Sequence, residues 1–147
     1  MSLKEILLND MKEAMKAKDV IKKNVITMLR SDIKNTEINE KCELDDDQIL
    51  DVISKQVKIK QKALIEFKNA NREDLVQETN QEILVLKNYL PQPLTAQELE
   101  KEIGSIIDQT QAKTLKDMGR VMSIAKKNLS HRADMQEVSA LIKEKLQ

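Results

Sequence analysis

The chain has 147 residues, of which 40% are hydrophobic and 34% charged, and its 25 basic residues balance 25 acidic ones. A zero net charge provides no overall field toward DNA or a membrane surface, and we expect neither as a partner. One Phe, one Tyr and no Trp argue against the base-stacking nucleic-acid modules, which need several aromatic side chains. Two Gly and two Pro in the whole chain favour long helices, and we predict an all-α fold.

Four helices are predicted in the first 90 residues, where apolar side chains recur every three or four positions. Their ranges are about 2–18, 19–38, 45–70 and 73–90. Ser2 and Asp45 are followed three residues later by Glu5 and Gln48, a pairing typical of helix N-termini. Residues 1–90 are therefore interpreted as an N-terminal four-helix module.

Both prolines follow directly, at Pro91 and Pro93. A proline lacks the amide hydrogen that a helix interior needs and clashes with the preceding turn, so residues 91–94 are predicted to form a hinge. Residues 95–147 are interpreted as a small C-terminal module of three helices. The ranges of these helices are about 95–109, 115–129 and 134–146.

The cysteine content and the apolar runs bear on cellular location. The single Cys42 cannot form an internal disulfide, the N-terminus lacks the apolar core of a signal peptide, and no apolar run approaches the length of a membrane span. These features predict a cytoplasmic protein in a reducing compartment.

Charged side chains fall on the apolar faces of the N-terminal helices. They are Asp10, Asp32, Lys60, Glu78 and Glu82. Because an unpaired buried charge is unfavourable, we predict a buried polar network in which Lys60 bridges some of the carboxylates. Groups at the edges of these faces could instead reach water. Carboxylates can also hold a metal ion or act as a general acid and base, and these alternatives stay open.

Familiar ligand and nucleophile patterns are missing from the sequence. A di-iron bundle needs Glu-x-x-His pairs, whereas the single histidine, His131, lies in the C-terminal module. Cys42 lies in an acidic loop between Glu40 and Asp47, a setting that does not activate a thiol. No glycine-rich phosphate loop and no serine nucleophile motif occurs. We therefore assign no catalytic residue, no metal ligand and no cofactor.

A basic segment lies between residues 113 and 132, with six Lys or Arg against one acid, Asp117, and a local net charge of +5. At about 100° per residue, Lys116, Arg120 and Lys127 lie within about 40° of one another on a helix. The candidate RNA-binding residues are this stripe and its flanks: Lys113, Lys116, Arg120, Lys127, His131 and Arg132. Such a stripe can neutralise RNA phosphates, and the alternative is an ordinary solvated helix face.

Several motifs resemble those of the YqeY family, in order and over nearly the whole chain. In the N-terminal module they are Asp10-Met11-Lys12, Lys18-Asp19, Phe67-x-x-Ala70-x-Arg72-x-Asp74-Leu75 and Tyr89-Leu90-Pro91. In the C-terminal module they are Asp117-Met118-Gly119-Arg120-Val121-Met122 and Arg132-Ala133-Asp134. The chain departs from the family pattern at His131, where a glycine would precede Arg132, and at Ser123 and Met135. A less flexible turn before the last helix is the expected consequence.

The resemblance implies a two-part helical fold whose C-terminal module is similar to the tail of the B subunit of glutamyl/aspartyl-tRNA amidotransferase. In that enzyme the tail contacts tRNA, and the kinase and ammonia-channelling chemistry lies elsewhere. We therefore expect an accessory tRNA-binding protein without its own catalytic site, with amidotransferase or other translation-related proteins as further partners. One alternative is a component of a carbon–nitrogen ligase with glutamine as amido-N-donor, acting with partner subunits. Another is a protein-interaction adaptor that uses the methionine-bearing faces of the C-terminal module.

Overall fold

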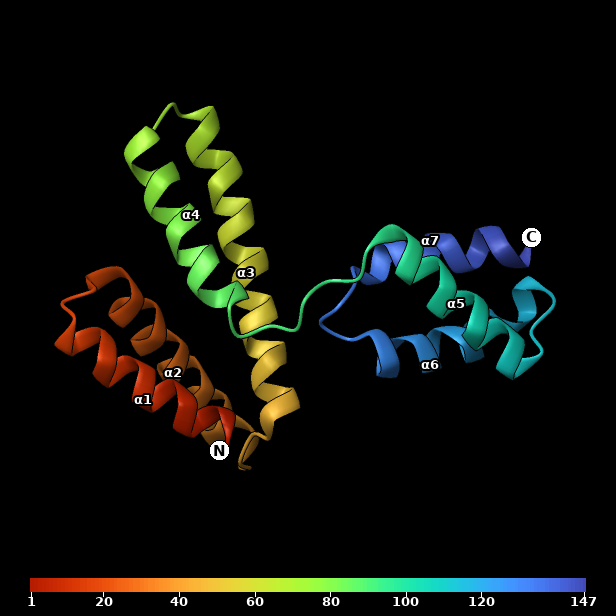
Figure 1. Ribbon diagram of the computed structural model, residues 1–147, viewed down its shortest axis with the longest axis horizontal. Helices are drawn as coiled ribbons and strands as arrows, with labels where there is room; N and C mark the ends of the chain where they lie inside the picture. Colours follow the sequence, from red (N-terminus) through yellow and green to blue (C-terminus); the bar gives the residue numbers. More distant parts are fainter. The chain divides into compact units, whose positions relative to one another are not determined.

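A computed structural model describes residues 1–147 and consists of seven α-helices, one short 3-10 helix and no strand (Figure 1). The all-α prediction is therefore confirmed. The chain divides into two compact units, Met1–Leu90 and Pro91–Gln147, which are called unit 1 and unit 2. None of the helices combines the length and the apolar character that crossing a membrane requires.

Unit 1 is built from two helical hairpins, in which α1 packs on α2 and α3 packs on α4. Its helices are α1 (Leu3–Lys16), α2 (Val20–Glu40), α3 (Asp46–Asn69) and α4 (Glu73–Lys87). The core is aliphatic and contains the fully buried side chains of Leu7, Ile26, Leu29, Ile49, Ile53 and Leu86. Removal of this apolar surface from water is the main stabilising contribution to the unit.

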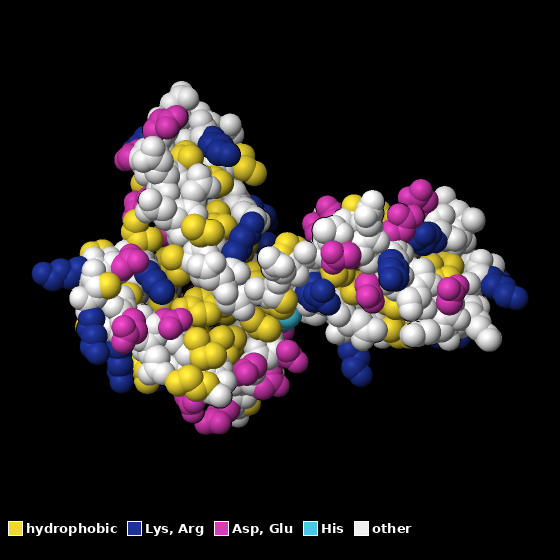
Figure 2. Space-filling view, viewed as in Figure 1, with side chains coloured by type: hydrophobic (Ala, Val, Ile, Leu, Met, Phe, Trp, Pro, Cys, Tyr) yellow, Lys and Arg dark blue, Asp and Glu magenta, His cyan; other side chains and the backbone are white.

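Short polar side chains cap the N-termini of α1, α2 and α3, whereas α4 follows Arg72 and has no side-chain cap. The Asp45 carboxylate accepts the amide hydrogen of Gln48 at 2.8 Å, and the Gln48 side chain accepts that of Asp45 at 2.9 Å. Ser2 Oγ accepts the amide hydrogen of Glu5 at 3.3 Å, so only one half of that capping box is formed. Figure 2 shows that Asp and Glu side chains gather around the connection between α2 and α3.

The buried face of α2 is not the single apolar stripe that a spacing of three or four residues predicts. Met28 fits the apolar stripe of the helix, yet its side chain is 57% exposed, whereas Ile26 is completely buried. The reason is that α2 contacts α1 on one side and both α3 and α4 on another. Because α2 has two contact surfaces, its buried face is wider than a single apolar stripe and is centred differently.

Unit 2 packs three α-helices around its own aliphatic core. Its elements are α5 (Ala96–Thr110), the 3-10 helix η1 (Leu115–Asp117), α6 (Met118–Leu129) and α7 (Met135–Leu146). The fully buried side chains include Ile103, Val121, Ala125, Val138 and Ile142. The amide of Leu94 donates to the carbonyl of Arg132 at 2.8 Å, which ties the segment before α5 to the α6–α7 turn.

The start of the basic helix is a correction to the sequence analysis. An α-helix is expected from Leu115, but residues Leu115–Asp117 form a 3-10 turn and α6 begins at Met118. Asp117 is the physical cause, because its carboxylate accepts the amide hydrogens of Lys113 at 2.9 Å and Thr114 at 3.3 Å. A side chain that accepts from the preceding loop amides in this way stabilises a 3-10 turn, after which the α-helix begins.

Five turns use a left-handed backbone without a glycine. The residues are Lys18, Lys41, Asn71, Gln111 and His131, with φ between 54° and 68°. Both glycines of the chain, Gly104 and Gly119, lie inside helices instead. Because the left-handed region is unfavourable for residues with a Cβ atom, each non-asparagine turn is less stable than a glycine would make it.

Replacing Gln111, the exposed residue after α5 with φ of 55°, by Gly should stabilise unit 2 by about 1 kcal/mol. Gln109 is an exposed residue inside the same helix, and Gln109→Gly should destabilise the unit by about 1 kcal/mol. Thermal or urea unfolding followed by circular dichroism measures both changes. Equal signs for the two variants would contradict the left-handed turn at Gln111.

Candidate functional site

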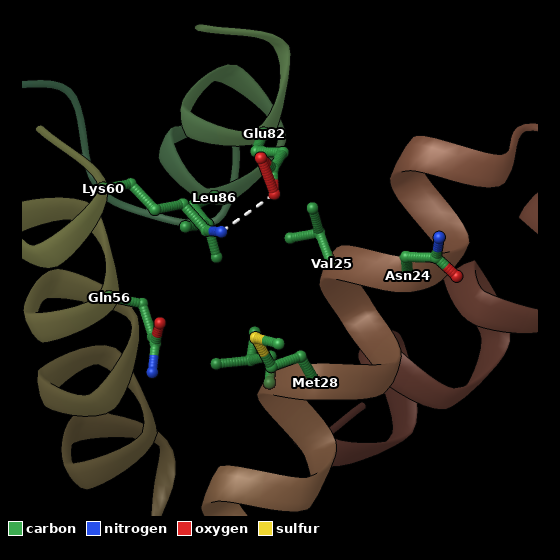
Figure 3. A pocket seen from close by; sticks show the side chains of 8 residues that line it. Asn24, Val25, Met28, Gln56, Lys60, Glu82 and Leu86 are labelled. Atoms are coloured by element: carbon green, nitrogen blue, oxygen red, sulfur yellow. Dashed lines mark hydrogen bonds and ion pairs between the residues drawn. The ribbon is translucent and has the colours of Figure 1, made fainter. Parts of the chain in front are cut away.

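An ion pair lines a small pocket among three helices of unit 1. The Lys60 ammonium lies 2.9 Å from the Glu82 carboxylate, and the two side chains are 17% and 25% exposed. Figure 3 shows Lys60 of α3 reaching Glu82 of α4 at the edge of a pocket of about 70 Å³. The remaining lining residues are Asn24, Val25, Met28, Leu29, Gln56 and Leu86. Each member of the pair supplies the charge that the other needs in this half-buried position.

Two other carboxylates have neutral partners. Tyr89 donates its hydroxyl hydrogen to Asp10 over 2.6 Å, and the Gln56 amide donates to the Asp32 carboxylate. Burial, together with the hydrogen bond to Asp10, raises the pKa of Tyr89 above its ordinary value. The first bond joins α1 to the end of α4, since 79 residues separate its partners.

These charges form separate pairs, one of which contains the predicted bridge from Lys60 to a carboxylate. Lys60 bridges to Glu82 alone among the carboxylates, while Asp10 and Asp32 bond elsewhere. Glu78 is exposed, because its neighbour Thr79 takes the buried position in that turn of α4. No group of three or more His, Cys, Asp or Glu side chains could hold a metal ion.

In unit 2 the basic segment, residues 113–132, has one apolar face that packs into the core. Val121, Ala125 and Leu129 of α6 are buried in the core. The basic side chains of the segment are all exposed: Lys113, Lys116, Arg120, Lys126, Lys127 and Arg132. Unit 2 therefore presents basic side chains from the α5–α6 connection, from α6 and from the α6–α7 turn.

Lys116 and Arg120 are placed differently from the expected stripe. Lys116 lies in η1, before α6 begins, so the angular spacing of one continuous helix does not apply to it. The Arg120 guanidinium donates to the carbonyl of Thr110 at 3.0 Å and lies 3.4 Å from the Asp117 carboxylate. Arg120 therefore holds the end of α5 against the start of α6, in addition to adding positive charge.

Asp117 is a site residue that the sequence reasoning counted only as a charge. Its hydrogen bonds from the amides of Lys113 and Thr114 lower the pKa of the carboxyl, and the Arg120 charge adds to this effect. The signal was present in the sequence, since Thr114 with Asp117 has the spacing of a capping box, which the structure forms. The only acid of the basic segment is thus bound within the fold.

The α6–α7 turn contains the remaining predicted residues. His131 is half-buried and has φ of 68°, and Arg132 is exposed with its carbonyl held by Leu94. A glycine would adopt this backbone at His131 without steric conflict. The chain therefore has a histidine in the left-handed backbone that suits the glycine of the family pattern, and the less flexible turn stays a prediction.

Similarity to known proteins covers almost the whole chain. A family model described as "Yqey-like protein" matches residues 4–146. The chain belongs to the YqeY-like protein family. This assignment confirms the resemblance that the sequence motifs indicated.

The YqeY-like chain is also similar to fungal proteins named "Altered inheritance of mitochondria protein 41, mitochondrial". The protein of Lachancea thermotolerans is 41% identical over 95 residues, which cover 64% of this chain and 51% of that protein. That of Saccharomyces cerevisiae strain YJM789 is 32% identical over 111 residues, which cover 74% and 60%. The chain thus spans between half and three fifths of these relatives. Their names place those proteins in mitochondria, and the cytoplasmic location of this chain stays a prediction.

In this YqeY-like chain, Lys60→Met should destabilise unit 1 by about 2 kcal/mol, because the half-buried Glu82 carboxylate loses its partner. Lys60→Met/Glu82→Met should lie within about 1 kcal/mol of wild type, since no charge then remains without a partner. Urea unfolding of the two single variants and the double variant measures the coupling. Additive effects of the single variants would contradict a functional ion pair between these side chains.

Tyr89 is the only tyrosine, so absorbance reports its ionisation without interference. Its raised pKa predicts a titration midpoint above 10 in the folded protein. The associated stability is present below pH 10 and is lost as the pH rises further, because the unfolded chain ionises first. Asp10→Asn should lower the midpoint but leave it above 10, since burial is the larger cause. A midpoint at the ordinary value would contradict the Asp10–Tyr89 contact.

Proposed function

We propose that the protein is an accessory tRNA-binding protein without its own catalytic site, and that unit 2 contacts the RNA. The observation that carries this proposal is the state of the charges in the basic segment. Asp117, its only acid, is held by two backbone amides and by Arg120. Five basic side chains remain exposed and form no ion pair: Lys113, Lys116, Lys126, Lys127 and Arg132.

Phosphate groups are the ligands that suit such a surface. Lysine ammonium groups neutralise RNA phosphates and release counterions, which produces affinity that falls steeply with salt. Contacts of this kind position a protein on the RNA but do not read its sequence. Selectivity for tRNA would therefore depend on the shape of the RNA against unit 2, including the turn at His131.

The alternative roles have less support. The adaptor hypothesis needs accessible methionines, but Met118 and Met122 pack against the core of unit 2 and are only partly exposed. A role in a carbon–nitrogen ligase rests on the resemblance to the amidotransferase subunit tail and needs catalytic partner subunits. Glutamine-dependent transamidation by a co-purified complex would test it.

The RNA proposal predicts that fluorescence anisotropy with bulk tRNA detects binding at low salt. Lys116→Ala/Lys127→Ala should weaken that binding and make the slope of log affinity against log salt shallower by about two units, because each lost phosphate contact removes about one. Both residues are exposed, so the fold should be unaffected.

Lys101→Ala/Lys143→Ala is a matched control. It removes two exposed lysines of unit 2 that lie outside the basic segment, and the change in net charge is the same. The salt slope of this variant should stay within about half a unit of wild type. Equal losses in both variants would indicate non-specific attraction to unit 2, and an absence of binding at low salt would refute the proposal.

A further inference from the structure

Unit 1 contains a second concentration of basic side chains, at the end where α1 meets α2. Residues 12–23 include five lysines against Glu13 and Asp19, a local net charge of +3. These lysines are Lys12, Lys16, Lys18, Lys22 and Lys23, here called the hairpin lysines. Figure 2 shows Lys and Arg side chains gathered at this end of unit 1.

The acidic residues of unit 1 gather at the opposite end of the same hairpin. Residues 37–51 include seven acids against Lys41, a local net charge of −6. In Figure 2 these two regions lie apart, with the acidic one around the connection of α2 to α3. A net charge of zero therefore conceals a strong separation of charge within one folded unit.

Few of the hairpin lysines have partners within the protein. Lys16 lies 4.0 Å from Glu13 in a pair whose side chains are 79% and 73% exposed, which adds little to stability. The Asp19 carboxylate accepts the backbone amide hydrogen of Lys22 at 3.1 Å. The ammonium groups of Lys12, Lys18, Lys22 and Lys23 form no ion pair within the chain.

Lys22 and Lys23 occupy positions that disfavour the fold. They lie in the first turn of α2, which has no acidic residue, and the positive end of the helix dipole repels them there. The first turns of α3 and α4 follow the favourable rule, with Asp46 and Asp47 in one and Glu73 and Asp74 in the other. A local conflict of this kind is typical of a surface kept for binding.

We infer that the hairpin lysines form a second contact with the RNA backbone, which extends the proposed function to unit 1. The inference rests on that proposal. The Asp19 cap is the one negative charge at the start of α2. An RNA phosphate beside this turn would add to it, because both the lysines and the helix dipole attract phosphate. Contacts from both units to one RNA would strengthen binding beyond either alone.

An anionic lipid surface shares this phosphate chemistry but fits the region less well. Few large apolar side chains are exposed beside the lysines: Met15 and Val20 by 54% and 62%, and Leu84, which lines the same pocket as Lys22, by 63%. Stable attachment to a membrane surface needs a larger apolar face or a second anchor. RNA requires only charges that reach the surface, which Lys12, Lys16 and Lys18 do as exposed side chains and Lys22 and Lys23 as half-buried ones.

The test compares two full-length variants that lower the net charge equally. Lys22→Glu/Lys23→Glu should make the tRNA salt slope shallower by about two units and should raise the melting temperature of unit 1 by about 3 °C, because the helix dipole is now matched. Lys34→Glu/Lys58→Glu changes two exposed lysines in the middle of α2 and α3. This control should produce no rise in melting temperature and less than half the change in slope.

The outcomes separate this inference from the proposed function. If wild type binds tRNA and the Lys116/Lys127 variant weakens binding while Lys22→Glu/Lys23→Glu does not, only the inference is overturned. If Lys22→Glu/Lys23→Glu alone weakens binding, the hairpin lysines stand and the unit 2 surface is refuted. If Lys22→Glu/Lys23→Glu loses binding to phosphatidylserine vesicles while its tRNA binding is unchanged, the inference is overturned and a lipid surface is the ligand. A lower melting temperature of Lys22→Glu/Lys23→Glu would contradict the claim that the helix dipole repels these two lysines.

Discussion

The two prolines impose the constraint on which the rest of the structure depends. Pro91 and Pro93 remove two amide donors within three residues, so α4 cannot continue into α5. The chain divides at this point into two compact units, and each must bury its own apolar surface. In unit 2 this requires nearly every apolar residue of the helix faces, including Ile103, Val121 and Ile142, which are fully buried.

Carboxylates near the turns have a second role, because they bind loop amides that no helix satisfies. Asp117 accepts from Lys113 and Thr114. Glu37 accepts from the amide of Leu44 at 2.8 Å and from the ammonium of Lys4, which lowers the pKa of its carboxyl. The charged partners of these two acids are Arg120 and Lys4, so neither acid neutralises a lysine of the two basic regions. A chain with no net charge can therefore present two separate basic regions.

Local signals predicted the elements better than the contacts between them. The caps at Ser2 and Asp45 depend on residues three positions apart, and in the structure both side chains accept the amide hydrogen of the third residue. The exposure of Met28 and the burial of Ile26 depend on which helices cover α2, which periodicity does not specify. The pairing of Asp10 with Tyr89 joins residues 79 positions apart and could not be read from either helix alone.

The sequence by itself determined the all-α fold, the approximate bounds of the helices and the family, because these follow from local propensity, capping and motif order. Only the tertiary structure decided which charges pair, since Lys60 meets Glu82 through the packing of α3 on α4. It also decided that Arg120 joins α5 to α6, although the angular pattern placed it beside Lys127. Side-chain partners depend on helix packing, and packing depends on the whole core at once.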